Sequence, residues 1–313
     1  MRHKPSVIFM GTPDFAVPAL TALADYGCRI PLVVTQPDRP KGRGRKLTPP
    51  PVKKAAEGLG LAIMQPEAAK SDAFYQAICE YRPDLLVVVA FGHILPKRVL
   101  EIPLYGAINV HASLLPKYRG PAPIQWAIIN GEEKTGVTTM LMDSGLDTGE
   151  ILMTSETPIY PKDTAGTLHD RLAQAGGELL KQTIAAMAAG SLRPIPQNHG
   201  EATYAPMLKK ADGRIDWTHS AERIERQIRG MNPWPQAHCF YEDLRLNLFK
   251  AEVRPATHNA LPGTVIPGFS KELRIAAGRD ALSILELQAA SGKRLPIGDF
   301  LSGMHIPEGA VLK

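Results

Sequence analysis

Asn109 and His111 are the two residues whose types and spacing best suit chemistry on a carbonyl group. They close the apolar run Ala107 to His111, which predicts a β-strand with both polar side chains on one face and Val110 on the other. An amide can donate to a carbonyl oxygen that becomes negative, and an imidazole can move a proton or stabilise charge. Alternatively, the two polar residues only form local hydrogen bonds at a strand end. The residue types and spacing alone do not decide between a catalytic and a structural role.

A third candidate is Asp147, which lies in the glycine-containing segment Met142 to Gly149. Glycines let a loop adopt unusual dihedral angles and approach a ligand closely. Asp and Gly are also the residues of ordinary turns, so this segment alone favours a plain turn. Its combination with Asn109 and His111 favours a site, because a neighbouring carboxylate stabilises an imidazolium ring and orients it.

The elements that must position these residues follow the alternation of an α/β domain. Five apolar runs predict buried strands, at Ser6 to Met10, Ile30 to Val34, Leu61 to Met64, Asp84 to Ala90 and Ala107 to His111. Helical patterns between them predict a doubly wound, mostly parallel, Rossmann-like sheet. Ligands of such sheets bind beyond the carboxyl ends of the strands, which is where Asn109 and His111 stand.

The chain is predicted to contain two domains joined by a linker. Residues 1–190 form the first domain, which ends with two more strands and a long helix at Val137 to Met142, Ile151 to Ile159 and Thr164 to Ala189. Residues 191–208 are rich in Pro, Gly and polar side chains, which is typical of a linker. Short alternating segments in residues 209–313 predict a small OB-like β-barrel.

Composition restricts the class of protein. With 313 residues, 44% of them hydrophobic and 21% charged, the chain is globular rather than fibrous or disordered. Three cysteines without CxxC spacing, and nine histidines that form no cluster with them, predict reduced thiols and no metal site. The sequence shows no signal-peptide core and no apolar run of about 18 residues, so we expect a cytoplasmic protein without a membrane partner.

Positive charge is concentrated in one segment. The net charge is +5, yet between Gln36 and Lys54 seven basic residues accompany the single acid Asp38, a local charge of +6. Five of the basic residues stand close together, namely Arg39, Lys41, Arg43, Arg45 and Lys46. Such a run is often only a solvated loop. The segment directly follows a predicted strand and so lies at the same edge of the sheet as Asn109 and His111. This position favours contact with RNA phosphates.

Eight longer motifs are spread over nearly the whole chain: Met10 to Phe15, Thr35 to Pro40, Asn109 to His111, Ser113 to Pro116, Arg119-Gly120, Ala122 to Gln125, Gly145 to Gly149 and Asn232 to Pro235. Together they resemble the methionyl-tRNA formyltransferase family. Members of that family use 10-formyltetrahydrofolate to formylate the α-amine of methionine on initiator tRNA. The resemblance implies that Asn109, His111 and Asp147 are the catalytic trio, in which Asn109 and protonated His111 stabilise an oxyanion and Asp147 maintains the charge on His111.

The resemblance also implies binding residues. Folate contacts are expected at Ser113, Leu114, Leu115 and Pro116, and along the backbone near Phe91, Gly92, Ile94 and Leu95. Arg43 matches the position at which the family's basic loop enters the tRNA acceptor end, and the neighbouring cations are expected to assist it. The C-terminal domain is expected to bind tRNA, in a monomeric protein that serves translation initiation.

Three other functions stay open at this point. A formyltransferase that acts on a small amine would use the same trio, but it would need neither the basic loop nor a second domain. An RNA-binding module with a decayed catalytic domain would not need Asn109, His111 and Asp147. A nicotinamide oxidoreductase is disfavoured, because Met10 to Asp14 lacks the GxGxxG fingerprint.

Overall fold

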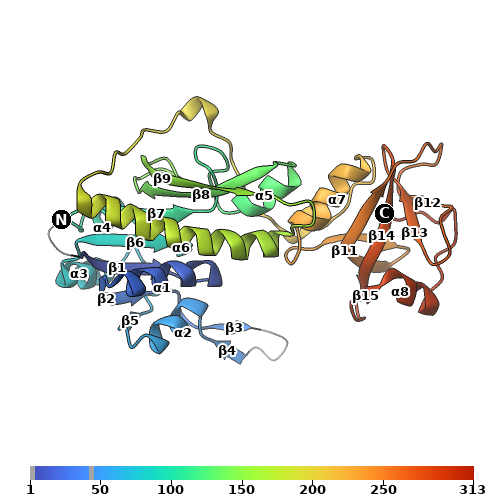
Figure 1. Ribbon diagram of the computed structural model, residues 1–313. Coiled ribbons are helices and arrows are strands. Elements are labelled where there is room, and N and C mark those ends of the chain that lie inside the picture. The colour runs from blue at the N-terminus through green and yellow to red at the C-terminus, as the bar shows by residue number, and fades with distance from the viewer. Residues whose placement is uncertain (1–3, 42–45) are drawn as a thin grey trace. The chain divides into compact units, whose positions relative to one another are not determined.

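The computed structural model describes residues 4–41 and 46–313. Contacts divide the chain into two units (Figure 1). Unit 1 comprises the described residues of Met1–Pro123 together with Lys134–Pro158 and His169–Ala205, and unit 2 comprises Ile124–Glu133, Ile159–Leu168 and Pro206–Lys313.

Unit 1 is built on a seven-stranded sheet. Its strands are β1 (Ser6–Gly11), β2 (Arg29–Val34), β5 (Ile63–Met64), β6 (Leu85–Val89), β7 (Ala107–His111), β8 (Lys134–Leu141) and β9 (Ile151–Pro158). The spatial order is β5-β2-β1-β6-β7-β8-β9. The first five strands in this order are parallel, and β8 and β9 are antiparallel at one edge. The doubly wound, mostly parallel sheet predicted from the sequence is confirmed, and its strand order reverses between β1 and β6.

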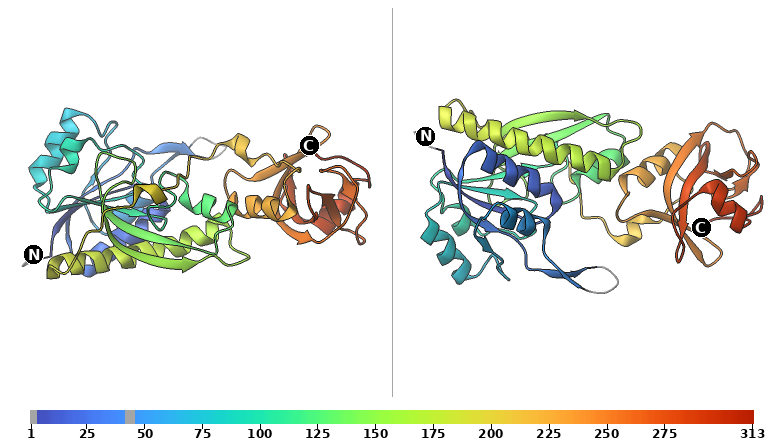
Figure 2. Two further views of the ribbon diagram at one scale, coloured as in Figure 1. Left: turned by 90° about the horizontal axis from the view of Figure 1, so that it is seen from above. Right: turned by 60° about the horizontal axis from the view of Figure 1, so that its bottom comes forward.

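Helices cover both faces of this sheet (Figures 1 and 2). They are α1 (Val17–Tyr26), α2 (Pro51–Gly58), α3 (Asp72–Tyr81), α4 (Lys97–Leu100) and the C-terminal part of α6 (Ala165–Ala189). Phe74 and Ile78 of α3 and Val99 of α4 share a core with Met10 and Val88 of the sheet. Within residues 4–41 and 46–313, no helix is both long and apolar enough to cross a lipid bilayer.

Glycines let α6 lie close to its neighbours. A Cβ atom added at Gly176 would lie 3.0 Å from Val110 Cγ1 of β7. A Cβ atom added at Gly177 would lie 2.8 Å from the carbonyl oxygen of Pro18, at the start of α1. Gly costs about 1 kcal/mol relative to Ala inside a helix, so both positions give up helix propensity in exchange for a close approach.

The segment that was expected to be a linker packs along unit 1. Ile195 forms a two-way backbone pair with Ile151 of β9, through N–O distances of 2.8 and 2.9 Å. Ala205 donates its backbone N–H to the Arg119 carbonyl at 2.7 Å. These hydrogen bonds join main-chain atoms and require no periodic pattern of side chains, so composition does not predict them.

Unit 2 is a small barrel flanked by helices. Its helices are α5 (Pro123–Ile129, of which Pro123 belongs to unit 1), α7 (Ala221–Gly230) and α8 (Ile297–Gly303), and its strands are β10 (Ala237–Tyr241), β11 (Leu244–Arg254), β12 (Val265–Ile266), β13 (Leu273–Ala276), β14 (Ala281–Ala289) and β15 (Leu295–Pro296). The order is β10-β11-β14-β13-β12, with β15 on β14. Val311 bridges Thr264 beside β12, and Leu312 bridges Tyr241 at the end of β10, so the last residues join the two edges of the sheet. The predicted barrel is confirmed, whereas α8 and β15 were not predicted because each is too short to show a period.

The close contact at Gly177 leads to a stability prediction. Gly177→Ala should lower the free energy of unfolding by about 1–3 kcal/mol, because the new methyl group meets the backbone of Pro18, which cannot easily move. Gly58→Ala is the matched control, since no atom lies within 4 Å of a Cβ at this position of α2 and Ala has the higher helix propensity. Urea unfolding of both variants measures the difference. A Gly177→Ala variant as stable as the wild type would contradict the packing described here.

The buried imidazole of His238 in unit 2 should make the unfolding free energy depend on pH. His238 of β10 is only 6% exposed, and burial lowers its pKa below the ordinary value although a hydrogen bond to the Gln236 carbonyl opposes this. The unfolded chain therefore binds the proton more readily, so the unfolding free energy should fall as the pH drops below about 6.5. His238→Gln should weaken this dependence between pH 7 and 5, and His305→Gln, at an exposed site, should not. Equal pH slopes in the two variants would show that His238 does not contribute.

Candidate active site

Strand β7 presents Asn109 and His111 on the sheet face opposite α6. Val110, which alternates with them, faces Gly176 of α6. Ala107, two residues before Asn109, belongs to the core on the α3 and α4 side. The alternation predicted from the spacing is therefore present, and both polar side chains lie at the carboxyl end of the strand beside β6.

Two neighbours fix the ring of His111, which is 7% exposed. Its Nε2 lies 2.9 Å from the Tyr118 carbonyl oxygen. A carbonyl can only accept, so we assign the hydrogen to Nε2. Its Nδ1 faces Asp147 Oδ2 at 3.6 Å, which is an ion-pair distance rather than a hydrogen bond. The ring is thus oriented by the main chain, with Nδ1 directed toward a carboxylate.

Asp147 lies in the loop that follows β8. Its φ of +53° is in the left-handed region that few residues other than glycine adopt. Its Oδ2 accepts the backbone N–H of Gly120 at 2.8 Å. Within the same loop, Asp143 Oδ1 accepts from the Gly145 backbone at 2.9 Å and from the Thr148 hydroxyl at 2.6 Å. The loop is therefore closed on itself and tied to Gly120.

The segment after His111 is held from β8. The Thr138 hydroxyl donates to the Ser113 carbonyl at 2.7 Å and accepts from the Leu115 N–H at 3.2 Å. Ser113 is fully buried, and its hydroxyl donates to the Lys117 carbonyl at 2.6 Å. Leu114 packs over β8 at Gly136, where a Cβ would collide with it. Pro116, the last of the predicted folate residues here, accepts at its carbonyl from the backbone N–H of Thr203 at 3.4 Å.

The second predicted folate segment follows β6. Phe91 and Leu95 are 2% and 6% exposed and belong to the core, whereas Ile94 is 78% exposed. The Phe91 carbonyl accepts from the Thr12 hydroxyl at 2.9 Å and from Gln36 Nε2 at 3.1 Å. Gly92 has a φ of +81°. The turn is therefore anchored at the ends of β1 and β2, close to the point where the strand order reverses.

The basic segment forms a hairpin of β3 (Arg39–Lys41) and β4 (Lys46–Thr48) rather than an irregular loop. Arg43 and Arg45 lie outside the described residues, and only the backbone of Lys41, which pairs with Lys46, is described. Arg39 Nη2 donates to Gln36 Oε1 at 3.0 Å, and Lys46 is exposed.

A carboxylate and two of its neighbours close the base of the hairpin. Hydrogen bonds from Gln65, at 2.7 Å, and Lys53, at 2.9 Å, lower the pKa of Asp38. The one acid of this segment is therefore already paired with Lys53.

The sequence interpretation missed Gln197 and did not assign the role of Arg119. Arg119 is 2% exposed, and its Nε and Nη2 donate to Gln197 Oε1 at 3.1 and 2.7 Å. Gln197 Nε2 in turn donates to the Asp147 carbonyl at 2.9 Å. The backbone of Tyr118 is held by the Thr203 hydroxyl at 2.8 Å. Gln197 and Thr203 lie in the expected linker, where no motif marks them.

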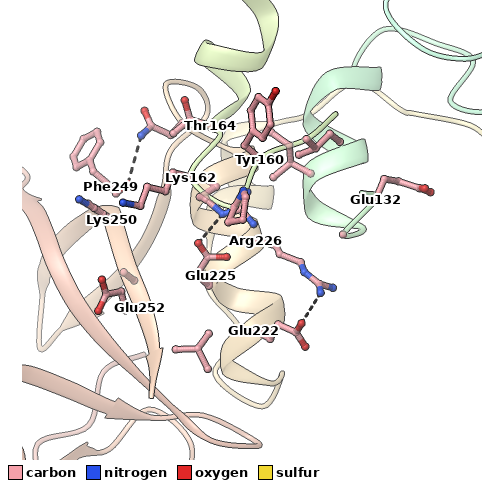
Figure 3. A pocket seen from close by; sticks show the side chains of 18 of the residues that line it. Glu132, Tyr160, Lys162, Thr164, Glu222, Glu225, Arg226, Phe249, Lys250 and Glu252 are labelled. Atoms are coloured by element: carbon pink, nitrogen blue, oxygen red, sulfur yellow. Dashed lines mark hydrogen bonds and ion pairs between the residues drawn. The ribbon is translucent and has the colours of Figure 1, made fainter. Parts of the chain in front are cut away.

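A separate cavity of about 680 Å³ lies in unit 2, between α5, α7 and β11 (Figure 3). Arg226 and Arg229 on its wall are each paired with a glutamate, Glu222 and Glu225, at 2.6 Å. None of the three predicted catalytic residues lines this cavity. Among the described residues, no group of three or more His, Cys, Asp or Glu side chains is arranged to hold a metal ion.

Comparison with known proteins identifies two family domains. Residues 4–184 match the model of the formyl transferase family, and residues 207–305 match that of the formyl transferase C-terminal domain. Methionyl-tRNA formyltransferase of Citrifermentans bemidjiense is 49% identical over 98% of this chain and 96% of its own. The enzyme of the same name from Desulfotalea psychrophila is 50% identical over 98% and 95%.

Solved structures share the fold at low identity. The sugar 3N-formyl transferase WlaRD has a TM-score of 0.66 and 18% identity, covering 93% of this chain and all of its own. HypX from Aquifex aeolicus, solved with tetrahydrofolic acid, has a TM-score of 0.61 and 16% identity, covering 96% of this chain and 47% of its own. Similarity to solved structures at this level supports the fold alone, but the curated relatives match along the whole length. The chain therefore belongs to the methionyl-tRNA formyltransferase family of formyl transferases.

Proposed function

We propose that this protein transfers a formyl group from 10-formyltetrahydrofolate to the α-amino group of methionine on initiator methionyl-tRNA. The observation that carries the proposal is the ring of His111, held between the Tyr118 carbonyl and the Asp147 carboxylate beside Asn109. The relatives that are 49–50% identical along the whole chain are named for this activity.

Residue chemistry gives each member of the trio a role. The amine nitrogen attacks the formyl carbon, a new C–N bond forms, and the carbonyl electrons move onto oxygen. Asn109 donates to that oxyanion through its amide, and His111 stabilises it as an imidazolium. The Asp147 carboxylate, 3.6 Å from Nδ1, balances the positive charge that the ring carries in this step. When the oxyanion collapses, the bond to the folate nitrogen breaks and that nitrogen gains the proton lost by the amine.

The formyl donor is assigned to the two segments that follow β6 and β7. The side chains of Phe91, Leu95 and Ser113 are buried, so they hold these segments in place and the main chain is left to contact the donor. The exposed side chain of Ile94 offers an apolar surface to an aromatic ring. HypX, which shares the fold, was solved with tetrahydrofolic acid, and this supports the class of donor.

The tRNA is assigned to the basic hairpin and to unit 2. Lys46 is exposed, and Asp38 is already paired with Lys53, so the positive charge of the hairpin can attract phosphates. Contacts to phosphates add affinity without reading sequence, which suits an RNA whose reacting group is an amino acid.

The direct test is transfer of labelled formyl from 10-formyltetrahydrofolate to charged initiator tRNA. Free methionine, glycinamide ribonucleotide and a nucleotide-linked amino sugar serve as competing acceptors. We expect rapid transfer to charged tRNA alone. Transfer to one of the small amines in preference to tRNA would overturn the proposal and favour a small-amine formyltransferase.

The trio should matter for rate far more than for folding. Asn109→Ala, His111→Ala and Asp147→Asn should each lower kcat by about 10²-fold or more, because each group acts on charge that develops in the transition state. Asp147→Asn keeps an oxygen for the Gly120 N–H, so the melting temperature should change little. Asp170→Asn, at an exposed site of α6, is the control. Normal turnover in any of the three variants would remove that residue from the mechanism.

The basic hairpin separates tRNA recognition from chemistry. Replacing Arg43, Arg45 and Lys46 with Gln should raise KM for charged tRNA and leave folate affinity unchanged. The salt dependence of tRNA binding should become shallower by about one unit of slope for each phosphate that the variant no longer binds. The matched control replaces three cations elsewhere in unit 1, namely the exposed Arg29 and Lys134 and the half-exposed Lys181. Equal effects of the two triple variants would mean that the hairpin acts only through net charge.

A further inference from the structure

The side chain of Gln197 is a junction between two loops of the proposed active site. It is 7% exposed and lies in residues 191–205, far in sequence from the groups that it contacts. Its Nε2 donates to the carbonyls of Asp147 at 2.9 Å and Gly149 at 2.7 Å. Its Oε1 accepts from Nε and Nη2 of Arg119 at 3.1 and 2.7 Å. All four hydrogen-bonding positions of the amide are used, so its orientation is fixed.

One side of this junction holds the Asp147 loop. Asp147 is in the left-handed region, a conformation that persists only where the surroundings impose it. Two bonds from outside the loop impose it here, from Gln197 to the Asp147 carbonyl and from Gly120 to the Asp147 carboxylate. Gly149 has no space for a side chain, since the Leu141 backbone occupies the position of a Cβ atom.

The other side holds the segment that orients His111. Arg119 stands between Tyr118, whose carbonyl is bound to His111 Nε2, and Gly120, whose N–H is bound to Asp147 Oδ2. Arg119 Nη2 also lies 3.3 Å from Nδ1 of His199. A displaced Arg119 side chain would therefore shift the backbone contacts of the ring and of the carboxylate together.

We infer that Gln197 is a positioning residue for the reaction: through Arg119 on one side and the Asp147 main chain on the other, it sets the carboxylate of Asp147 against Nδ1 of His111. This inference rests on the proposed function, in which that pair stabilises developing charge. Gln197 touches no reacting atom. Its effect should therefore appear in kcat rather than in KM, because misplacing a catalytic group by about 1 Å can cost about 10²-fold in rate.

Gln197→Glu is the sharpest variant. It preserves shape and leaves carboxylate oxygens to accept from Arg119, but it removes both donors to the Asp147 loop. We expect kcat for formyl transfer to fall about 10- to 100-fold, with KM for tRNA and for folate within about threefold of wild type. Gln197→Met, similar in size and uncharged, repeats the test without a new charge. Asn198→Asp is the control, because this exposed neighbour loses a donor to Glu201 without contacting either loop.

A second readout does not depend on the substrate. The Gly120 amide hydrogen, bound to Asp147 Oδ2, should exchange with solvent at least tenfold faster in Gln197→Glu, while amides of β1 and β6 keep wild-type rates. A purely structural role would instead accelerate exchange throughout unit 1 or lower the melting temperature with kcat intact, and either result overturns the inference. So does wild-type kcat in both Gln197 variants.

The two proposals can fail separately. If the wild-type protein forms no formylmethionyl-tRNA, the proposed function falls. The Gly120 exchange then still decides whether Gln197 positions Asp147, since a tenfold local increase supports the positioning and an unchanged rate overturns it.

Discussion

The hydrogen bond between His111 Nε2 and the Tyr118 carbonyl is the interaction on which the site depends. It occupies Nε2, and it leaves Nδ1 as the nitrogen that faces the carboxylate of Asp147. The bond forms because His111 is the last residue of β7 and the chain turns back toward its ring within the next seven residues. Tyr118 has a φ of +60° and Gly120 one of +112°, so this return needs backbone conformations that β7 itself cannot supply.

Burying Arg119 is the cost of this arrangement. A guanidinium that is 2% exposed loses most of its hydration, and in a protein interior that penalty amounts to several kcal/mol. Charge-assisted hydrogen bonds to Gln197, together with the contact to His199, offset part of it. A neutral apolar side chain of similar size could fill the space but would not donate to Gln197 and connect the two loops.

The sequence was informative where residues follow a period or stand at a strand end. Asn109 and His111 could be placed on one face because β7 alternates, and the parallel strands could be predicted because they are short apolar runs. Gln197 could not be found, because its partners are two backbone carbonyls 48 and 50 residues away, which leave no trace in residue type, and the side chain of Arg119, 78 residues away. The β3–β4 hairpin and α8 escaped prediction for another reason, since three-residue strands and a seven-residue helix are too short for any periodic signal.

The proposed mechanism leaves the choice of acceptor to residues outside the trio. The sugar 3N-formyl transferase WlaRD and an N-formyltransferase of Helicobacter canadensis, solved with dTDP-3-aminofucose, share this fold at TM-scores of 0.66 and 0.65 with 18% and 19% identity. The fold by itself therefore does not specify the acceptor. In the proposed mechanism Asn109, His111 and Asp147 act on the formyl carbon and the attacking nitrogen, which are common to such reactions. What distinguishes a charged tRNA from a sugar is its many phosphates and its size, and only positive charge and extended surface respond to those features. In the proposed function, the hairpin that follows β2, with its acid already paired to Lys53, supplies charge and the barrel of unit 2 supplies surface. Neither alters β7, which carries Asn109 and His111.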